Sequence, residues 1–247
     1  MRRSAVSPRR RTWLRELFDR IDPEPVIAAL EDLATPARCE RLRHVFDQRI
    51  ESVTVVMDAP HDPHNGAAVL RSCDAFGVYR IHVVERSEPF CASGAVAKGT
   101  ERWVDAVSHP TAADAIARLR HEGYRLVGTH PEGELTPQAL RNVERLALVM
   151  GNEHDGICEE LNAACEARVR VPMRGFVESL NVSVTAAILL SQAAGDRPGD
   201  LPPERRRQLY ARGLLMSVPR ALDVLEARGI HLPEADARDL AVDDPIE

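Results

Sequence analysis

The chain is poor in lysine, in aromatic residues and in long apolar runs. Of its 32 basic residues only Lys98 is a lysine, so nearly all of its cations are arginines. Because a guanidinium can hold two phosphate oxygens at once, any anion that this chain binds is expected to meet an arginine. No apolar run approaches the roughly 18 residues that a membrane-spanning helix needs, so we expect no membrane partner.

Cysteine is also scarce, with 5 residues and no C-x-x-C pair. This argues against a disulfide framework and against a zinc site, and it favours a reducing, cytoplasmic location. His61 and His64 lie close in sequence, but Pro63 stands between them and no third ligand is apparent, so we expect no metal. The arginine-rich stretch Met1 to Arg15 has no apolar core, which excludes a secretory signal and favours a disordered basic tail over a transit peptide.

Several common catalytic motifs are missing. The sequence has no G-x-G-x-x-G after a strand, no phosphate-binding P-loop and no G-x-S-x-G nucleophile elbow. These absences argue against a nucleotide-binding regulator of the doubly wound type and against a hydrolase.

The charge is distributed unevenly along the chain. The net charge is −6, but residues 1–49 and 201–231 each carry +3, the body 50–200 carries −7 and the tail 232–247 carries −5. Basic segments thus flank an acidic body. Such segments can bind phosphates, although solvated helix faces explain each of them equally well when it is taken alone.

Hydrophobic spacing predicts helices followed by an alternation of strands and helices. Short helices are expected over 13–21, 26–33 and 35–49, the last with Thr35 as cap, Leu42, Val45, Phe46 and Ile50 as its apolar stripe, and Arg38, Arg41, Arg43 and Arg49 opposite. Strands are then expected over 53–58, 81–84, 103–107, 124–129, 146–150 and 169–171, with helices over 63–76, 112–122, 157–165 and 181–194. Residues 204–228 form one or two helices interrupted near Pro219. The alternation is typical of an α/β domain with a mostly parallel sheet.

Polar residues follow three of these strands. They occur in His61-Asp62-Pro63-His64-Asn65, in Gly151-Asn152-Glu153-His154-Asp155-Gly156, and in the stretch from Pro172 to Asn181. Because the carboxyl ends of parallel strands meet at one edge of a sheet, these loops are expected to build one site. Ser179 or Asn181 caps the helix after the third loop, whose free N–H groups suit a polar or anionic ligand.

Together the three stretches resemble the signature motifs of the SPOUT methyltransferases, in the TrmH (SpoU) branch of RNA ribose 2'-O-methyltransferases. The first motif runs from Pro63 to Val78, the second from Gly151 to Ile157, and the third from Pro172 to Ser183. The resemblance implies a parallel sheet with a deep C-terminal trefoil knot over about Thr129 to Leu190, flanked by N- and C-terminal helices, and a homodimer. It also implies that S-adenosylmethionine binds against Thr129, Gly151, Val171, Met173 and Leu180.

The same resemblance assigns the catalytic residues. Arg71 would act on the ribose 2'-hydroxyl, and Asn65, Glu153, Ser179 and Asn181 would orient Arg71, the cofactor and the ribose. Because the pKa of a guanidinium lies above about 12, a phosphate or water, rather than Arg71 itself, is the more economical proton acceptor. A purely structural alternative makes Asn65 a helix cap and Glu153 a member of an ordinary salt bridge. Gly66, where the family has a small or apolar side chain, is expected to delay the helix by one or two residues.

The helical segments before and after the motifs resemble those of the tRNA enzymes that methylate the D-loop guanosine at position 18. The chain would divide into an N-terminal extension (1–36), the methyltransferase domain with its N-terminal helix (37–195), a helical RNA-binding extension (196–231) and an acidic tail (232–247). The RNA-binding candidates are His64, Arg41, Arg205, Arg206, Arg207 and Arg212. Two alternatives stay open: the same chemistry on ribosomal RNA, and a catalytically silent RNA-binding protein on the same fold.

Overall fold

The computed structural model describes residues 13–14, 16–85, 99–152 and 154–233. The expectations for the basic N-terminal tail, for Glu153 and for most of the acidic tail fall outside the described residues. Contacts divide the chain into two units, one formed by Met1–Arg49 with Asp200–Glu247 and the other by Ile50–Gly199. Within the described residues, no helix is long and apolar enough to span a membrane.

The larger unit is built on a six-stranded sheet with the order β3-β2-β1-β5-β4-β6, in which every neighbouring pair is parallel. Its strands are β1 (Val53–Asp58), β2 (Arg80–Val84), β3 (Asp105–His109), β4 (Arg125–Thr129), β5 (Leu146–Met150) and β6 (Ala167–Val169). The α/β prediction is confirmed. The third strand begins two residues later than expected and the sixth ends two residues earlier.

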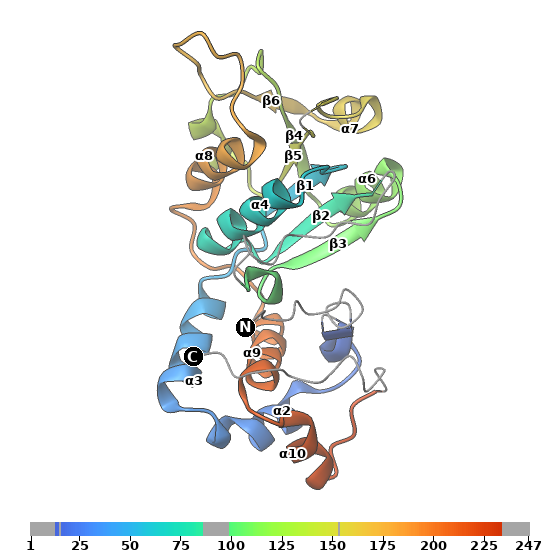
Figure 1. The fold of residues 1–247 in the computed structure, drawn as a ribbon, viewed down its shortest axis with the longest axis vertical. Coiled ribbons are helices and arrows are strands. Elements are labelled where there is room, and N and C mark those ends of the chain that lie inside the picture. Colours follow the sequence, from blue (N-terminus) through green and yellow to red (C-terminus); the bar gives the residue numbers. More distant parts are fainter. Residues whose placement is uncertain (1–12, 15, 86–98, 153, 234–247) are drawn as a thin grey trace. The chain divides into compact units, whose positions relative to one another are not determined.

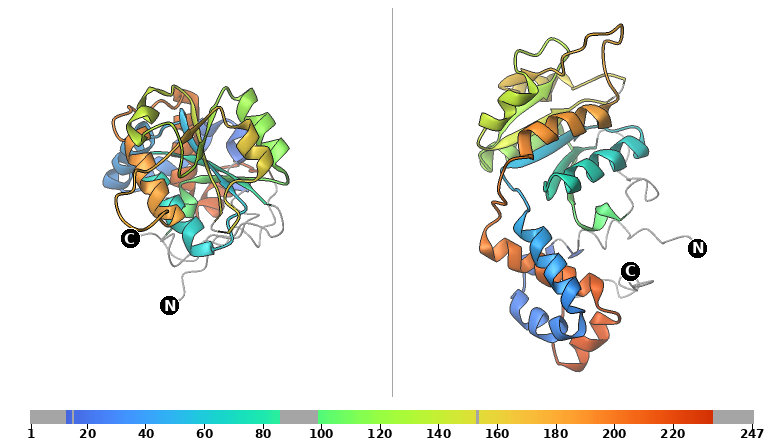
Figure 2. Two further views of the ribbon diagram at one scale, coloured as in Figure 1. Left: turned by 90° about the horizontal axis from the view of Figure 1, so that it is seen from above. Right: turned by 90° about the vertical axis from the view of Figure 1, so that its left-hand side faces the viewer.

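Helices cover both faces of this sheet (Figure 1). On one face α4 (Pro63–Ala75) and α8 (Val182–Ala194) lie side by side (Figure 2), and on the other lie α6 (Ala112–His121) and the short α7 (Glu159–Ala164). The 3-10 turns η3 (Thr100–Arg102) and η4 (Pro137–Asn142) belong to the same unit. All six residues of β1 are buried. Val55 and Met57 join the core under α4 and α8, whereas Val56 joins the core under α6, as the two-residue period of a strand requires.

The smaller unit is helical. It contains η1 (Leu17–Asp19), α2 (Pro23–Leu30), η2 (Glu31–Leu33), α3 (Pro36–Asp47), α9 (Pro203–Ser217) and α10 (Ala221–Ala227). Pro23 opens α2 instead of only ending the helix before it, because Asp22 caps the first turn, where a proline lacks no hydrogen bond. Thr35 caps α3 as expected. This unit includes α3, which packs on α9, whereas the sequence assigned that helix to the methyltransferase domain.

Arg49 was placed on the polar face of α3, and this placement is wrong. The α-helix ends at Asp47, and Arg49 lies beyond it with only 1% of its surface exposed. The helical period therefore no longer applies at this position.

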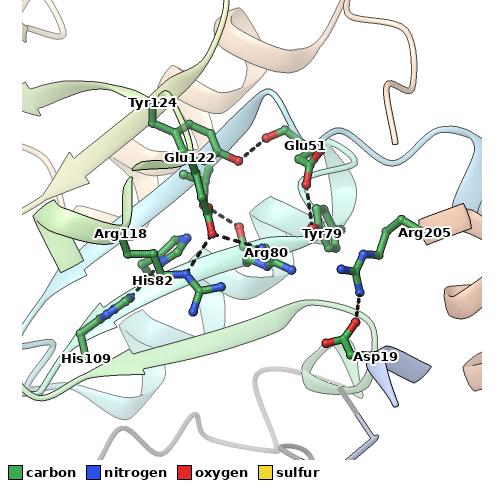
Figure 3. A network of polar contacts seen from close by, with 11 residues as sticks. Asp19, Glu51, Tyr79, Arg80, His82, His109, Arg118, Glu122, Tyr124 and Arg205 are labelled. Atoms are coloured by element: carbon green, nitrogen blue, oxygen red, sulfur yellow. Dashed lines mark hydrogen bonds and ion pairs between the residues drawn. The ribbon is translucent and has the colours of Figure 1, made fainter. Parts of the chain in front are cut away.

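A polar network lies at the amino edge of the sheet (Figure 3). The Tyr124 hydroxyl donates to the Glu51 backbone carbonyl at 2.5 Å, and the Tyr79 hydroxyl donates to the Glu51 carboxylate at 3.2 Å. Glu122 pairs with Arg118 at 3.0 Å and with Arg80 at 3.9 Å. These contacts tie the starts of β1, β2 and β4 together at the edge opposite to the polar loops.

Because of Tyr124 in this network, the free energy of unfolding is expected to change with pH in the alkaline range. Burial raises the pKa of Tyr124 to about 12 from 10.0, against the opposing effect of Arg145. The fold thus favours the neutral phenol, and the resulting stability is complete below pH 10.0 and falls as the pH rises toward 12. Between pH 10 and 11 we expect wild type to lose about 1 kcal/mol more unfolding free energy than Tyr124→Phe, in urea titrations. Equal pH slopes for the two proteins would contradict this.

Arg197 follows the end of α8 and makes several hydrogen bonds within the larger unit. Its guanidinium donates to backbone carbonyls of Ala193 at 2.7 Å, Glu144 at 2.8 Å and Val143 at 2.5 Å, and to the Ser52 hydroxyl at 3.1 Å. One side chain therefore links the end of α8 to the segments that lead into β1 and β5. Hydrogen bonds from a charged donor contribute about 1.5–3 kcal/mol each and several are lost together.

We expect Arg197→Ala to destabilise the larger unit by about 3 kcal/mol or more. Hydrogen exchange of peptides from β1 and β5 measures this unit directly. Arg197→Lys should recover little, because an ammonium cannot span the same set of carbonyls. Arg120→Ala, at an exposed position on α6, serves as the control. An Arg197→Ala protein that exchanges like this control would refute the assignment.

Candidate active site

The polar loops after β1, β5 and β6 meet at the carboxyl edge of the sheet. The strand order reverses between β1 and β5, since β2 and β3 continue on one side and β4 and β6 on the other. Ligands of open α/β sheets bind at such a switch point. The expectation of a single loop cluster at this edge is supported by the residues that share its cavities.

The first loop leads into α4 through a cap on Asp62. One Asp62 carboxylate oxygen accepts from the His64 backbone N–H at 2.8 Å, and Pro63 occupies the first helical position. The helix therefore starts at Pro63, and the expected delay at Gly66 is wrong. Gly66 itself donates to the Asp62 carbonyl at 3.1 Å. Asn65 is not the cap, which removes the structural alternative for that residue.

Asn65 and Asn181 join the amino ends of α4 and α8. The Asn181 side-chain amide donates to the Asn65 side-chain oxygen at 3.0 Å. The Asn181 oxygen accepts from the backbone and hydroxyl of Ser183, at 2.8 and 2.6 Å, so that Asn181 is also the cap of α8. The Asn181 side-chain amide therefore has hydrogen-bond partners at both its nitrogen and its oxygen, which fixes its orientation.

A cavity of about 720 Å³ opens between the ends of β4, β5 and β6 and the loop before α8. All five residues expected to hold the cofactor line it, together with Ser179 and Asn181. Its volume lies within the range of small-molecule sites. Arg71 is exposed on α4, and neither Arg71 nor Asn65 belongs to the lining of this cavity. The residues lining the cavity are Thr129, His130, Pro131, Met150, Gly151, Asn152, Gly156, Ile157, Val169, Arg170, Val171, Pro172, Met173, Glu178, Ser179, Leu180, Asn181, Val182 and Thr185.

The loop after β5 is folded back on itself and shapes one wall of the cavity. Asn152 and Gly156 exchange backbone hydrogen bonds of 3.1 and 3.2 Å, and the Asn152 side chain accepts from His154 and Asp155 backbone N–H groups at 2.9 and 2.7 Å. A Cβ added to Gly151 would lie 2.3 Å from the Gly156 carbonyl carbon. Only glycine fits at position 151 while the loop keeps this path.

Two polar residues of this edge were missed from the sequence. Asn152 lies within the second motif and had no predicted role, although its hydrogen bonds to His154, Asp155 and Gly156 hold the loop together. Asp58 is the last residue of β1, is 1% exposed, and accepts a hydrogen bond from the Cys158 backbone N–H at 2.7 Å. The sequence signal for Asp58 was a carboxylate at the end of a buried strand, next to the polar loop that follows this strand. Among the described residues no cluster of side chains suits a metal ion.

The arginines proposed for RNA contact differ in their surroundings. In the smaller unit Arg205 pairs with Asp19 at 2.9 Å, Arg206 with Asp47 at 3.0 Å, and Arg207 with Glu24. The Arg207 guanidinium lowers the pKa of the Glu24 carboxyl, mainly because it donates a hydrogen bond to that carboxylate. Arg41 is exposed on α3, and in the larger unit His64 is exposed beside Asp62 at 3.2 Å.

Arg212 does not fit its expected role in phosphate contact. It is 4% exposed, because the second half of α9 is buried on all sides from Leu209 to Met216. The sequence grouped Arg212 with Arg205, Arg206 and Arg207 as a candidate, but its burial within the smaller unit keeps it from the surface.

Comparison with known proteins finds relatives of this chain both in sequence and in fold. The model of the SpoU rRNA Methylase family matches residues 52–191. The tRNA (guanosine(18)-2'-O)-methyltransferase of Escherichia coli K12 is 32% identical over 211 residues, which cover 81% of this chain and 91% of that protein.

Two solved structures resemble this one. The tRNA-modifying TrmH/SpoU enzyme of A. aeolicus has a TM-score of 0.66 at 24% identity, over 72% of this chain and 95% of that one. An rRNA methyltransferase of Sinorhizobium meliloti, solved with bound AdoMet, has a TM-score of 0.53 at 29% identity, over 62% of this chain and 59% of that one. With the family model spanning more than half of its length, this chain belongs to the SpoU rRNA methylase family.

Proposed function

We propose that this protein transfers a methyl group from S-adenosylmethionine to a ribose 2'-oxygen of RNA. The observation that carries the proposal is the cavity of about 720 Å³, lined by all five residues that the family motifs assign to the cofactor. The S. meliloti relative, which was solved with AdoMet, supports the choice of cofactor.

The residues of the cavity suit this cofactor. Gly151, Val171 and Leu180 offer backbone and apolar surface for an uncharged adenine, while Glu178 offers negative charge for a cationic group of the ligand. The absence of room for a Cβ at Gly151 keeps the backbone close to the cavity. S-adenosylmethionine supplies an electrophilic methyl group, so the protein has to position the attacking oxygen in line and to stabilise its developing charge.

In the proposed mechanism Arg71 stabilises the negative charge that develops on the attacking oxygen. Its guanidinium binds a phosphate next to the target ribose and stabilises negative charge as the 2'-oxygen forms its bond to the methyl group. The hydroxyl proton passes from that oxygen to a phosphate oxygen or to water, since Arg71 stays protonated. The hydrogen bond from Asn181 to Asn65 joins α8 to α4, the helix that carries Arg71, and thereby holds the two helix ends in fixed relation.

The favoured substrate is tRNA, at guanosine 18 of the D-loop. The E. coli relative that carries this name is matched over 91% of its length, which includes both flanks of the methyltransferase motifs. Ribosomal RNA is the second candidate, because the S. meliloti relative is an rRNA enzyme, although it matches over a smaller share of both chains. A catalytically silent RNA-binding protein is disfavoured by the presence of Arg71, Asn65 and Asn181. A tRNA substrate would place the protein in the cytoplasm.

RNA would contact exposed cations near this edge and on the helical unit. Arg41 and His64 are exposed, and the His64 ring lies 3.2 Å from the Asp62 carboxylate. Arg205, Arg206 and Arg207 each have a carboxylate partner, so a phosphate has to displace Asp19, Asp47 or Glu24 before it gains full contact. We therefore assign these three arginines a weaker share of RNA affinity than their charge alone suggests.

The finer architecture is also part of this proposal. We assign the segment from Thr129 to Leu190 to a trefoil knot, since α8 follows the edge strand β6 in sequence and yet packs on η4 and α4. We assign the protein to homodimers, because Phe176, Val177 and Val184 are exposed apolar residues on the third loop and α8. Such surface favours burial against a second copy.

Labelled S-adenosylmethionine tests the proposal with the purified full chain. Bulk tRNA and ribosomal RNA from cells that lack the enzyme are offered separately, and the labelled nucleoside is identified by mass spectrometry. A 2'-O-methylguanosine in the D-loop of tRNA is the expected product. Label in ribosomal RNA alone would move the substrate to the second candidate. No label in either RNA, together with tight cofactor binding, would overturn the catalytic proposal.

A further inference from the structure

Two histidines that the family motifs leave without a role stack on each other at the carboxyl edge of the sheet. The rings of His61 and His154 have centroids 5.4 Å apart and an interplanar angle of 22°. His61 comes from the loop between β1 and α4, and His154 comes from the loop after β5. Both side chains are exposed.

The two loops meet beside the candidate catalytic residues. A small cavity between them is lined by Pro60 and Asn65 on one side and by Gly151 and Asn152 on the other. Gly151 and Asn152 also line the large cavity. The stacked pair therefore bridges two loops that flank Asn65 and the proposed cofactor site.

The backbone positions His154 firmly for such a contact. Its N–H donates to the Asn152 side chain at 2.9 Å, inside the loop that Asn152 and Gly156 close with their backbone bonds. His61 lies two residues after Ala59, which holds a left-handed φ of 46°. A non-glycine residue in that region is uncommon and turns the chain sharply after the strand.

We propose that the His61–His154 pair is a stacking platform for an unpaired nucleobase of the RNA substrate. Imidazole rings stack on splayed-out bases, and single-stranded loops are the RNA segments that present such bases. A base seated here would lie at the same edge as Asn65, within reach of the ribose that receives the methyl group. The pair would thus select RNA in which a base next to, or at, the target is unstacked.

This inference deepens the proposed function and rests on it for the identity of the substrate. It commits to a nucleobase, whereas a protonated imidazole could also meet a phosphate. The two ligands differ in what they need from the side chain. A base needs an aromatic face, which phenylalanine keeps, and a phosphate needs a proton donor, which phenylalanine lacks.

The experiment measures equilibrium binding of the full chain to the RNA that accepts methyl, with S-adenosylhomocysteine present. If no RNA accepts methyl, an unmodified tRNA transcript is used. The variants are His154→Ala, His61→Ala and His154→Phe, and His121→Ala, an exposed position at the end of α6, is the matched control. Single abasic substitutions are scanned through the RNA loop against each variant.

We expect His154→Ala to weaken RNA binding about 5- to 150-fold, the range found when an aromatic partner of one base is removed. His61→Ala should act in the same direction, whereas His154→Phe and His121→Ala should stay within about threefold of wild type. At one loop position the abasic substitution and His154→Ala should be non-additive, because both remove the same contact. Affinity for S-adenosylhomocysteine should not change.

Three outcomes would overturn the platform. They are normal RNA binding by His154→Ala, additivity with every abasic position, and a His154→Phe protein as defective as His154→Ala, which would assign a polar contact instead. A failure of the proposed catalysis gives a different combination of RNA binding and methyl transfer. RNA binding with a non-additive position but without any methyl transfer would overturn the catalysis and leave the platform standing, whereas a protein that binds no RNA would overturn both.

Discussion

Replacing Arg71 with alanine is expected to lower methyl transfer by about 10³-fold while the affinity for S-adenosylmethionine stays within about threefold of wild type. The size follows from removing a charged donor aimed at a developing negative charge. Cofactor affinity is spared because Arg71 does not belong to the lining of the large cavity. Single-turnover kinetics with saturating RNA measures the first quantity and isothermal calorimetry the second.

Two further variants make the Arg71 result specific. Arg71→Lys keeps the charge but loses the planar fork, and it should recover only a small part of the rate. Arg120→Ala removes another exposed arginine, from α6 and away from the loop cluster, and should behave like wild type. Near-normal turnover of the Arg71→Ala protein would remove Arg71 from the catalytic residues.

A Gly151→Ala variant is expected to lose cofactor binding by 100-fold or more (on the order of 3 kcal/mol or above). The added Cβ would lie 2.3 Å from the Gly156 carbonyl carbon and 2.5 Å from the Ile157 nitrogen, so the loop has to move. These neighbours are backbone atoms and cannot rotate away. Because Gly151 and Gly156 both line the cavity, that movement changes its wall.

Gly175→Ala is the matched control, since a Cβ at that position meets nothing within 4 Å. It lies on the third loop and should bind cofactor normally. Thermal unfolding shows whether Gly151→Ala still folds. If the Gly151→Ala protein is folded and binds cofactor as wild type does, the loop after β5 does not form the cofactor site.

Much of the larger unit follows from the sequence alone. Buried parallel strands such as Val53–Asp58 and Leu146–Met150 are mostly apolar, and their bounds are the same in the sequence and in the structure. The helix start at Pro36 was also marked by a capping residue and a proline, whereas the helix that starts at Pro63 was expected to be delayed by Gly66. Local chemistry decides these features, so a local pattern is sufficient to find them.

Features that depend on contacts between distant residues could not be found in this way. The sequence gives no sign that the Asn65 side chain accepts from Asn181, 116 positions later. Burial of Arg49 and Arg212 likewise depends on which helices pack around them. For the site, the family resemblance named some of the residues that line the large cavity, whereas the stacking of His61 on His154 depends on two loops that meet in space.

The most direct test of the proposed site is a crystal structure of the full chain with S-adenosylhomocysteine. We predict the ligand in the cavity between β4, β5, β6 and the loop before α8, in contact with Gly151, Val171 and Leu180. Its sulfur should face the edge that carries Asn65 and Arg71, from the same chain or from a second copy. A ligand bound elsewhere, with this cavity empty, would contradict the assignment of the cofactor site and the mechanism built on it.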